Sequence, residues 1–307
     1  MELRKHYFLD RWVLINPSRS NRPHQFRETK IHKKMKNCLF CPGNEKITGN
    51  EIGRVGNKEW RIRWIQNKFP AVIDKGNTEI VKDELYTHAN AFGYHEVIVE
   101  TPSHKKHIYD LSNKEFLELL KVYRNRHHEL NSKKNIKFVS IFKNHGKDAG
   151  TSIEHSHSQV VAFGMTPEII KEKISKSYKK KKCLYCDIVK KEMKTKRRCF
   201  QNKTFAAFTP YASRFHYEIW IVPKKHITDF DLNDSQLKDL NEIFQKILKR
   251  LKKLGCSFNY YFQNHDKLHF HVEIIPRIEN YAGFEWSTET IINPIAPEDA
   301  AKYYRGK

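Results

Sequence analysis

The stretch from Asn144 to Gln159 reads NHGKDAGTSIEHSHSQ and places two histidines, His155 and His157, two residues apart and shortly before a glutamine. Imidazole has an ordinary pKa of about 6.5, so a neutral histidine near pH 7 attacks phosphorus without first losing a proton. The amide N–H groups of Gln159 suit an oxygen that gains negative charge during such an attack. H-x-H-x-Q alone is a weak indication of catalysis, and its weight comes from the rest of the chain.

Most of the chain occurs twice in the same order, and this repetition predicts the fold. The shared landmarks are a C-x-x-C pair, a strand ending near a histidine, an amphipathic stretch, a second strand leading to Asn-His, and an H-x-H motif. They are Cys38/Cys41, His95–Glu100 with His104, Ser112–Leu130, Phe138–Phe142 and His155/His157 in the first copy, and Cys183/Cys186, Tyr217–Val222 with His226, Asp234–Leu254, Tyr260–Gln263 and His269/His271 in the second. We therefore expect two units, over residues 1–170 and 171–307.

The two amphipathic stretches predict one long helix in each unit. Ser112 with Glu115 three residues later is a capping box, and apolar residues follow it at helical spacing. Asp234 to Leu254 has a similar apolar face and ends before Gly255, a typical C-terminal residue. The strands at His95–Glu100 and Tyr217–Val222 alternate and are rich in β-branched residues. The expected class is α+β, with two tandem units that each pack a long helix on a mainly antiparallel sheet.

Each copy also supplies two cysteines and two histidines that suit a metal ion. In a reducing compartment, C-x-x-C pairs accompanied by histidines favour a metal over a disulfide. Two thiolates and two imidazoles suit tetrahedral zinc and leave no open position, so we expect about two structural zinc ions per chain. Cysteines that merely pack as small hydrophobic residues would explain one copy more readily than two. The expected ligands are Cys38, Cys41, His104 and His155 in the first copy and Cys183, Cys186, His226 and His269 in the second.

The copies differ directly after the H-x-H motif. The first continues with Ser158 and Gln159, whereas the second continues with Val272 and Glu273. A carboxylate about 4 Å from a phosphate costs about 4 kcal/mol at an effective dielectric constant near 20. We expect the second copy to be catalytically silent. Because a regular strand would aim His155 and His157 at one face, we also expect the backbone to bend at the motif.

The chain has 307 residues and a formal net charge of +22, which raises the question of nucleic acid as a partner. The lysines are spread along the chain, and the densest block, Lys179–Lys182, lies where a linker is expected. We therefore expect attraction of anionic substrates and no specific nucleic-acid site. The sequence has neither a long apolar run nor a signal-like start, so we expect a cytoplasmic protein with no membrane span.

Four segments resemble the galactose-1-phosphate uridylyltransferases and their relatives in the histidine-triad superfamily, which include ADP-glucose phosphorylases. Asn16–Pro23 is similar to an Arg-Pro substrate loop, Asn67–Pro70 to a nucleotide-base loop, Asn144–Gln159 to the active-site motif, and Ala282–Pro294 to a C-terminal segment. Many uridylyltransferases have H-P-H-G-Q, whereas this chain has HSHSQ, which is closer to the phosphorylase-like branch. This departure bears on which nucleotide and which acceptor the protein uses, whereas the expected type of reaction stays the same.

The resemblance implies a double displacement of a nucleotidyl group through His157, with His155 as a zinc ligand and Gln159 holding the phosphoryl oxygen. It also implies a homodimer. The further implied substrate-binding residues are Arg19, Arg22, Asn67, Phe69, Asn144, Gly146, Gly150 and Ser152. The first expectation is exchange of UDP-glucose with galactose 1-phosphate. The alternatives are a phosphorylase or hydrolase of ADP-glucose or dinucleoside polyphosphates, and a non-catalytic nucleotide or nucleic-acid binding module.

Overall fold

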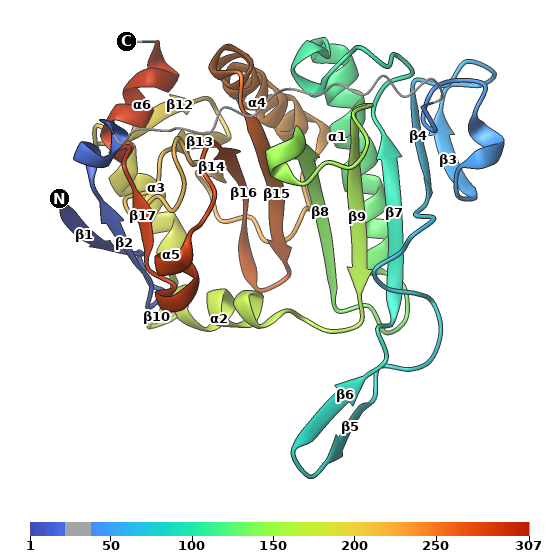
Figure 1. Ribbon diagram of the computed structural model, residues 1–307, viewed down its shortest axis with the longest axis horizontal. Coiled ribbons are helices and arrows are strands. Elements are labelled where there is room, and N and C mark those ends of the chain that lie inside the picture. Colours follow the sequence, from blue (N-terminus) through green and yellow to red (C-terminus); the bar gives the residue numbers. More distant parts are fainter. Residues whose placement is uncertain (22–37, 307) are drawn as a thin grey trace.

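Ten strands form one antiparallel sheet that runs through the whole molecule in the computed structural model, which describes residues 1–21 and 38–306 (Figure 1). The strand order is β12-β13-β14-β16-β15-β8-β9-β7-β4-β3. Five strands come from the first copy: β3 (Glu51–Val55), β4 (Ile62–Gln66), β7 (Gly93–Val99), β8 (Phe138–His145) and β9 (His157–Phe163). Five come from the second: β12 (Arg198–Gln201), β13 (Phe205–Phe208), β14 (Ile219–Pro223), β15 (Ser257–His265) and β16 (Leu268–Arg277).

The two copies meet where β8 pairs with β15, with Asn144 opposite Asn259 and Phe142 opposite Tyr261. On either side of this junction the strands follow in mirrored order. The expected α+β class and the two antiparallel units are confirmed. The boundary expected between residues 170 and 171 falls within helix α2 (Glu168–Lys176), and a division there stays a prediction.

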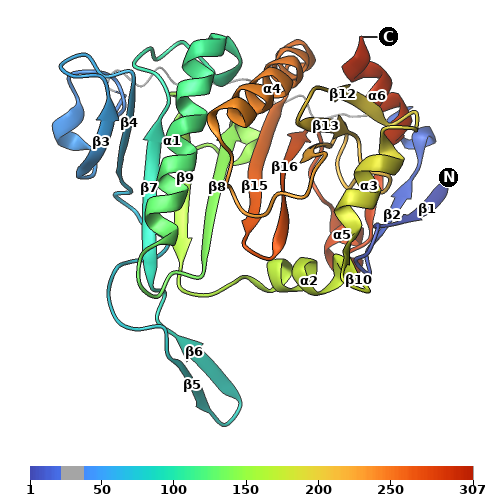
Figure 2. The same cartoon turned by 180° about the vertical axis from the view of Figure 1, so that it is seen from behind.

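Helices α1 (Asn113–Asn131) and α4 (Asp234–Leu254) lie side by side across one face of the sheet (Figure 2). The capping box predicted for α1 is present, because Ser112 Oγ accepts from the Glu115 N–H while the Glu115 carboxylate accepts from the Ser112 N–H. Helix α4 has the predicted bounds and ends at Gly255 in the left-handed conformation. Phe116 of α1 and Phe244 of α4 touch, with ring centroids 5.2 Å apart, so both copies share one core.

Smaller elements surround this sheet. Beside the second copy lie β1 (Glu2–Lys5), β2 (Trp12–Ile15), β17 (Ile291–Asn293), α5 (Gly283–Thr288) and α6 (Pro297–Arg305), and near them α3 (Leu184–Glu192) with the short pair β10 (Tyr178–Lys179) and β11 (Lys182–Cys183) (Figure 1). Single 3-10 turns occur at Pro17–Asn21, Glu45–Ile47, Ile108–Asp110 and Lys147–Ala149. The hairpin of β5 (Ile80–Asp83) and β6 (Tyr86–Ala89) projects from the body of the molecule (Figures 1 and 2). No helix in the part of the chain described here is long and apolar enough to cross a membrane.

One strand begins later than the alternation predicts. The sequence indicated a strand from Tyr217 to Val222, but β14 starts at Ile219. Tyr217 has φ of 57°, a left-handed conformation that no strand adopts, and the Glu218 N–H donates to the Phe215 carbonyl to close a turn. The aromatic residue that looked like the start of the strand therefore belongs to the preceding turn.

Candidate active site and metal clusters

His157 is the first residue of β9, and one contact of its ring shows which ring nitrogen carries the hydrogen. His155 lies in a bend just before the strand, as expected. Nδ1 of His157 is 2.8 Å from the His155 carbonyl oxygen, and since a carbonyl only accepts, Nδ1 carries the hydrogen. The lone pair is therefore on Nε2. Burial, with a further contribution from nearby Lys143, lowers the pKa of His157 to about 4, so the imidazole is neutral near pH 7.

A buried network fixes the backbone on either side of this histidine. Lys143 Nζ donates to Glu100 Oε2 at 2.7 Å, to Ser156 Oγ at 3.1 Å and to the His157 carbonyl oxygen at 2.8 Å. The Tyr123 hydroxyl donates to Glu100 Oε1 at 3.0 Å. None of the sequence motifs indicates this network. Its only signal was a charged residue, Lys143, at an inward position of a strand that is otherwise largely apolar.

Gln159 lies two residues after His157 on the same face of β9, away from α1. Its Oε1 is 2.8 Å from Nε2 of His95 on β7. Next to His95 is the predicted base loop, in which the Asn67 N–H donates to the His95 carbonyl and the Phe69 N–H donates to Asn67 Oδ1. Phe69 is 82% exposed. The structure thus brings Asn67 and Phe69 close to Gln159 through His95, for which the sequence predicted only a place in a strand.

The predicted phosphate turn has the expected glycines but uses its amides internally. Gly146 has φ of 84°, and a Cβ there would lie 2.3 Å from Ser257 Oγ, so only glycine fits. The Gly150 N–H donates to the Lys147 carbonyl and therefore does not point at a ligand in this conformation. Asn144 Oδ1 accepts from Asn259 Nδ2 at 2.8 Å, and Ser152 is exposed.

Arg19 follows a strand of the small sheet β1-β2-β17, whereas His157 begins β9 of the ten-stranded sheet. Arg19 lies in the turn after β2, where the Asn16 N–H donates to the Asn293 carbonyl of β17. This region lies beside the second copy, toward the opposite end of the molecule from β4 and β3 (Figure 1). Arg22 lies outside the described residues.

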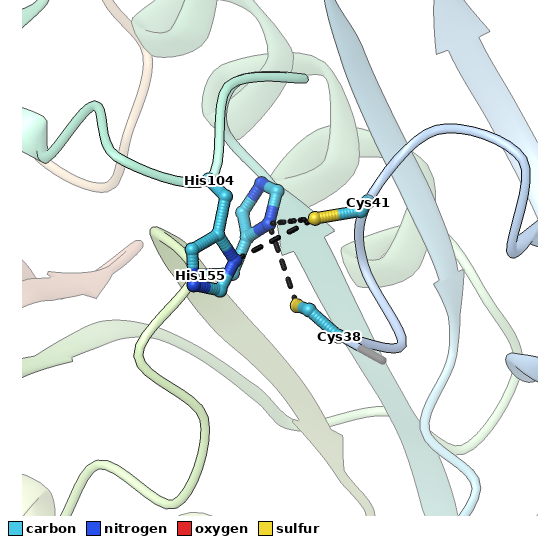
Figure 3. Close-up of side chains that lie close together, drawn as sticks. All are labelled: Cys38, Cys41, His104 and His155. Atoms are coloured by element: carbon cyan, nitrogen blue, oxygen red, sulfur yellow. Dashed lines mark hydrogen bonds between the residues drawn. The ribbon is translucent and has the colours of Figure 1, made fainter. Parts of the chain in front are cut away.

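The first predicted metal cluster is assembled from three separate segments. Cys38 and Cys41 approach His104 and His155, and all four ligand atoms lie within 4.8 Å of one another (Figure 3). Three of the four sulfur–nitrogen separations, Cys38–His155, Cys41–His104 and Cys41–His155, are 3.5 to 3.6 Å. Tetrahedral zinc with Zn–S near 2.3 Å and Zn–N near 2.05 Å requires about 3.6 Å. His155 Nε2 lies 2.7 Å from the Thr101 carbonyl and donates to it, which directs the Nδ1 lone pair toward the thiols.

The second cluster has the same construction. Cys183, Cys186, His226 and His269 place their ligand atoms within 4.8 Å of one another. The two Nδ1 atoms are 3.2 Å apart, against about 3.3 Å for tetrahedral zinc. His269 Nε2 lies 3.1 Å from the Pro223 carbonyl oxygen, and this contact corresponds to the one of 2.7 Å between His155 Nε2 and Thr101. Within residues 1–21 and 38–306, these are the two groups whose donors fit a metal ion.

The second H-x-H motif is enclosed by protein. His271 Nδ1 is 2.8 Å from the His269 carbonyl, which repeats the contact of His157, but His271 is 0% exposed. Its Nε2 meets Glu273 Oε1 at 3.3 Å, and Glu273 is paired with Lys173 and Arg214. Burial alone would raise the pKa of Glu273, but these two cations hold it well below its ordinary value. A substrate phosphate has no access to this histidine in the structure.

Comparison with known proteins agrees with this geometry. Residues 1–167 match the sequence family described as "Galactose-1-phosphate uridyl transferase, N-terminal domain". The chain is 30% identical to an ADP-glucose phosphorylase from Arabidopsis thaliana over 99% of this chain and 92% of that protein. It is 27% identical to a galactose-1-phosphate uridylyltransferase from Thermotoga maritima over 99% and 98% of the two chains.

Solved structures show the same relationship. The crystal structure of an ADP-glucose phosphorylase from Arabidopsis thaliana with bound ADP-glucose has a TM-score of 0.87 and 28% identity, and covers 100% of this chain and 99% of that chain. A uridylyltransferase structure has a TM-score of 0.78 and 26% identity, and covers 100% and 98%. The resemblance drawn from the motifs is confirmed. The fold, the paired Cys/His clusters and these matches show that the chain belongs to the galactose-1-phosphate uridyl transferase family.

Proposed function

We propose that this protein is a nucleotidyltransferase that acts on nucleotide sugars by double displacement, with His157 as the nucleophile. The observation that carries the proposal is the contact between His157 Nδ1 and the His155 carbonyl, because it leaves the Nε2 lone pair for attack. Gln159, on the same face of β9, supplies N–H donors for the phosphoryl oxygen. Lys143 holds the backbone on which both residues depend.

The two steps balance in atoms and electrons. Nε2 of His157 attacks the α-phosphorus, a P–N bond forms, and the P–O bond to hexose 1-phosphate breaks, with its electron pair leaving on the phosphate oxygen. An oxygen of a second phosphate then attacks the nucleotidyl-histidine, and the electron pair of the P–N bond returns to Nε2. No proton has to leave His157 in either step, because the attacking nitrogen carries none.

The first candidate for the pair of substrates is UDP-glucose with galactose 1-phosphate as acceptor. A second candidate is phosphorolysis of ADP-glucose, favoured by the HSHSQ motif and by the similarity to the Arabidopsis phosphorylase. The exposed Phe69 stacks on any base and does not discriminate between the two. An exchange assay with radiolabelled galactose 1-phosphate or inorganic phosphate, against UDP-glucose and ADP-glucose, identifies the pair that turns over.

We further propose that each Cys/His cluster binds zinc, giving two ions per chain with structural roles. Support comes from the donor sets and their spacing, which suit a closed tetrahedral site. Bound zinc would link segments distant in sequence and favour the thiolate forms of the cysteines. Without a cation, burial and then the neighbouring Cys38 raise the pKa of the Cys41 thiol to about 11. Reduced C-x-x-C pairs of this kind fit a cytoplasmic location, which we also propose.

A homodimer completes the proposal. The turn after β2, which contains Arg19, lies toward the opposite end of the molecule from β4 and β3, so a substrate contact from Arg19 would be made in the site of a second copy (Figure 1). The projecting hairpin exposes apolar side chains, with Ile80 55%, Leu85 92% and Tyr86 72% exposed, and suits contact with another chain. Sedimentation equilibrium should give twice the chain mass, and a monomer with full activity would exclude this part of the proposal.

The nucleophile is tested by trapping the intermediate. Enzyme mixed with nucleotide sugar alone should release one equivalent of hexose 1-phosphate and carry an acid-labile, base-stable nucleotidyl group on His157, located by mass spectrometry. His157→Ala should carry no label while keeping its metal content. A label on another residue, or full turnover by His157→Ala, would refute the mechanism.

A further inference from the structure

We propose that His95 is a positioning residue that fixes which end of the Gln159 amide faces the reacting phosphate. The inference rests on the role of Gln159 in the proposed function and adds a residue that the motifs do not contain. In the antiparallel pair of β7 and β9, Val97 lies opposite Gln159, so His95 is diagonal to Gln159 on the same face of the sheet. The contact between His95 Nε2 and Gln159 Oε1 measures 2.8 Å.

The hydrogen of the His95 ring is assigned by its other nitrogen. The backbone N–H of Ala71 points at Nδ1 over 3.0 Å, and a peptide nitrogen only donates, so Nδ1 holds the lone pair. A neutral imidazole carries one hydrogen, which is therefore on Nε2 and is donated to Gln159 Oε1. Burial lowers the pKa of His95 although the hydrogen bond to Gln159 opposes this, and the ring stays neutral.

Asn67 gives a check on this assignment. Its Nδ2 lies 3.0 Å from His95 Nε2, and its Oδ1 accepts from the Phe69 N–H at 2.9 Å, which orients the amide. Asn67 Nδ2 and His95 Nε2 then both carry hydrogens, so the contact between these two nitrogens is not a hydrogen bond. The opposite tautomer would set a ring N–H against the Ala71 N–H, which cannot turn away because it belongs to the backbone. The hydrogen on Nε2 is the arrangement with the smaller conflict.

The consequence for Gln159 follows from the shape of a carboxamide. Its oxygen and its NH₂ group are nearly equal in size and opposite in polarity, so rotation by 180° exchanges an acceptor for two donors. With Oε1 held by His95, the NH₂ group remains for a phosphoryl oxygen. With Oε1 released, the amide also populates the reverse orientation, in which its oxygen repels that phosphoryl oxygen.

Two amide substitutions separate this role from simple anchoring of the loop. In His95→Asn the shorter side chain reaches about as far as Nδ1 and keeps a partner for the Ala71 N–H, but it does not reach Gln159. In His95→Gln the longer side chain reaches about as far as Nε2 and restores a donor to Gln159 Oε1. His128→Asn is a matched control, because this exposed histidine on α1 meets the Phe230 carbonyl and the His127 ring, on the side of the molecule away from Gln159.

The measurement is the single-turnover rate of His157 labelling at saturating nucleotide sugar. We expect His95→Asn to lose about tenfold, a part of the roughly 100-fold that loss of a transition-state donor costs. In His95→Asn the nucleotide-sugar concentration at half-saturation, the zinc content and the thermal midpoint should be unchanged. His95→Gln should recover most of the single-turnover rate. The double variant His95→Asn/Gln159→Ala should match Gln159→Ala alone, because residues that act through one group are not additive.

Four results would overturn the inference. They are an unchanged rate in His95→Asn, a loss in His95→Gln equal to that in His95→Asn, a change confined to half-saturation, and losses that multiply in the double variant. Each of these leaves wild-type labelling intact and therefore leaves the proposed function standing. Absence of label on wild-type His157 is a separate result, which removes the proposed function and this inference together.

Discussion

His155 and His157, separated by one residue, carry their ring hydrogens on different nitrogens. In each ring the hydrogen lies on the nitrogen that contacts a backbone carbonyl oxygen. His155 donates from Nε2 to the Thr101 carbonyl and turns Nδ1 toward the thiols. His157 donates from Nδ1 to the His155 carbonyl and keeps its lone pair on Nε2. In the proposed function, the ring nitrogen that meets a backbone acceptor thus decides whether the side chain is a metal ligand or a nucleophile.

At this scale we predict separate outcomes for the two histidines. His155→Ala should reduce bound zinc from about two ions to about one and lower the thermal midpoint, because structural zinc contributes roughly 10 kcal/mol or more in small domains. His157→Ala should retain both ions. Elemental analysis of the purified variants measures the difference, and two zinc ions in His155→Ala would contradict the ligand assignment.

The buried His271 gives the complementary prediction. His271→Ala should still accept the label on His157, because Glu273 beside it is already paired with Lys173 and Arg214. It should nevertheless lose about 1–3 kcal/mol of stability, since the ring packs against Tyr185 and Trp220 with centroids 4.6 and 5.6 Å away. Labelling of His157 tests the first part of this prediction, and chemical denaturation tests the loss of stability. Loss of label from a folded variant would show that the second motif takes part in the chemistry.

The helices and strands that could be predicted from the sequence are those whose ends are marked by nearby residues. The N-terminal cap of α1 and the bounds of α4 follow from Ser112, Glu115 and Gly255, whose effects reach only one helical turn. The metal clusters were predictable because the same spacing occurs twice. The contacts of His95 and Lys143 were not, because their partners are set by strand register and depth of burial, which no local pattern in one sequence encodes.

The C-terminal helix α6 supplies a pH-dependent prediction. Glu298 accepts from Arg4 at 3.0 Å and from Arg197 at 2.8 Å. Burial alone would raise its pKa, but these hydrogen bonds lower it. A lowered folded-state pKa stabilises the fold above the unfolded value of about 4.3, and this stabilisation is lost as the pH falls below that value.

Glu298→Gln should therefore be about 1–2 kcal/mol less stable than wild type at pH 7, with the difference shrinking below about pH 4. Urea unfolding at a series of pH values measures it. Glu168→Gln is the control, because its carboxylate is 85% exposed and its pair with Lys171 contributes well under 1 kcal/mol. A difference between wild type and Glu298→Gln that is independent of pH would exclude the ion pairs as its cause.

At the scale of the whole molecule, the two copies depend on each other. Strands β8 and β15 pair at the junction, and Tyr123 and Tyr260 from the two halves join hydroxyls at 2.9 Å in the shared core. A fragment of residues 1–170 should therefore fail to fold as a monomer, because it would expose the edge of β8 and the apolar face of α1. Circular dichroism and sedimentation of the fragment test this, and a cooperatively folding monomer would contradict it.

The mirrored strand order on either side of β8 and β15 also bears on how such a chain evolves. Two identical chains that pair through equivalent edges carry every substitution twice, so a change that inactivates one site inactivates both. Joining the copies in one polypeptide removes that constraint, and one copy is free to diverge while the other remains under selection. The second copy has Glu273 at the position of Gln159, and the two residues can differ because each is encoded separately.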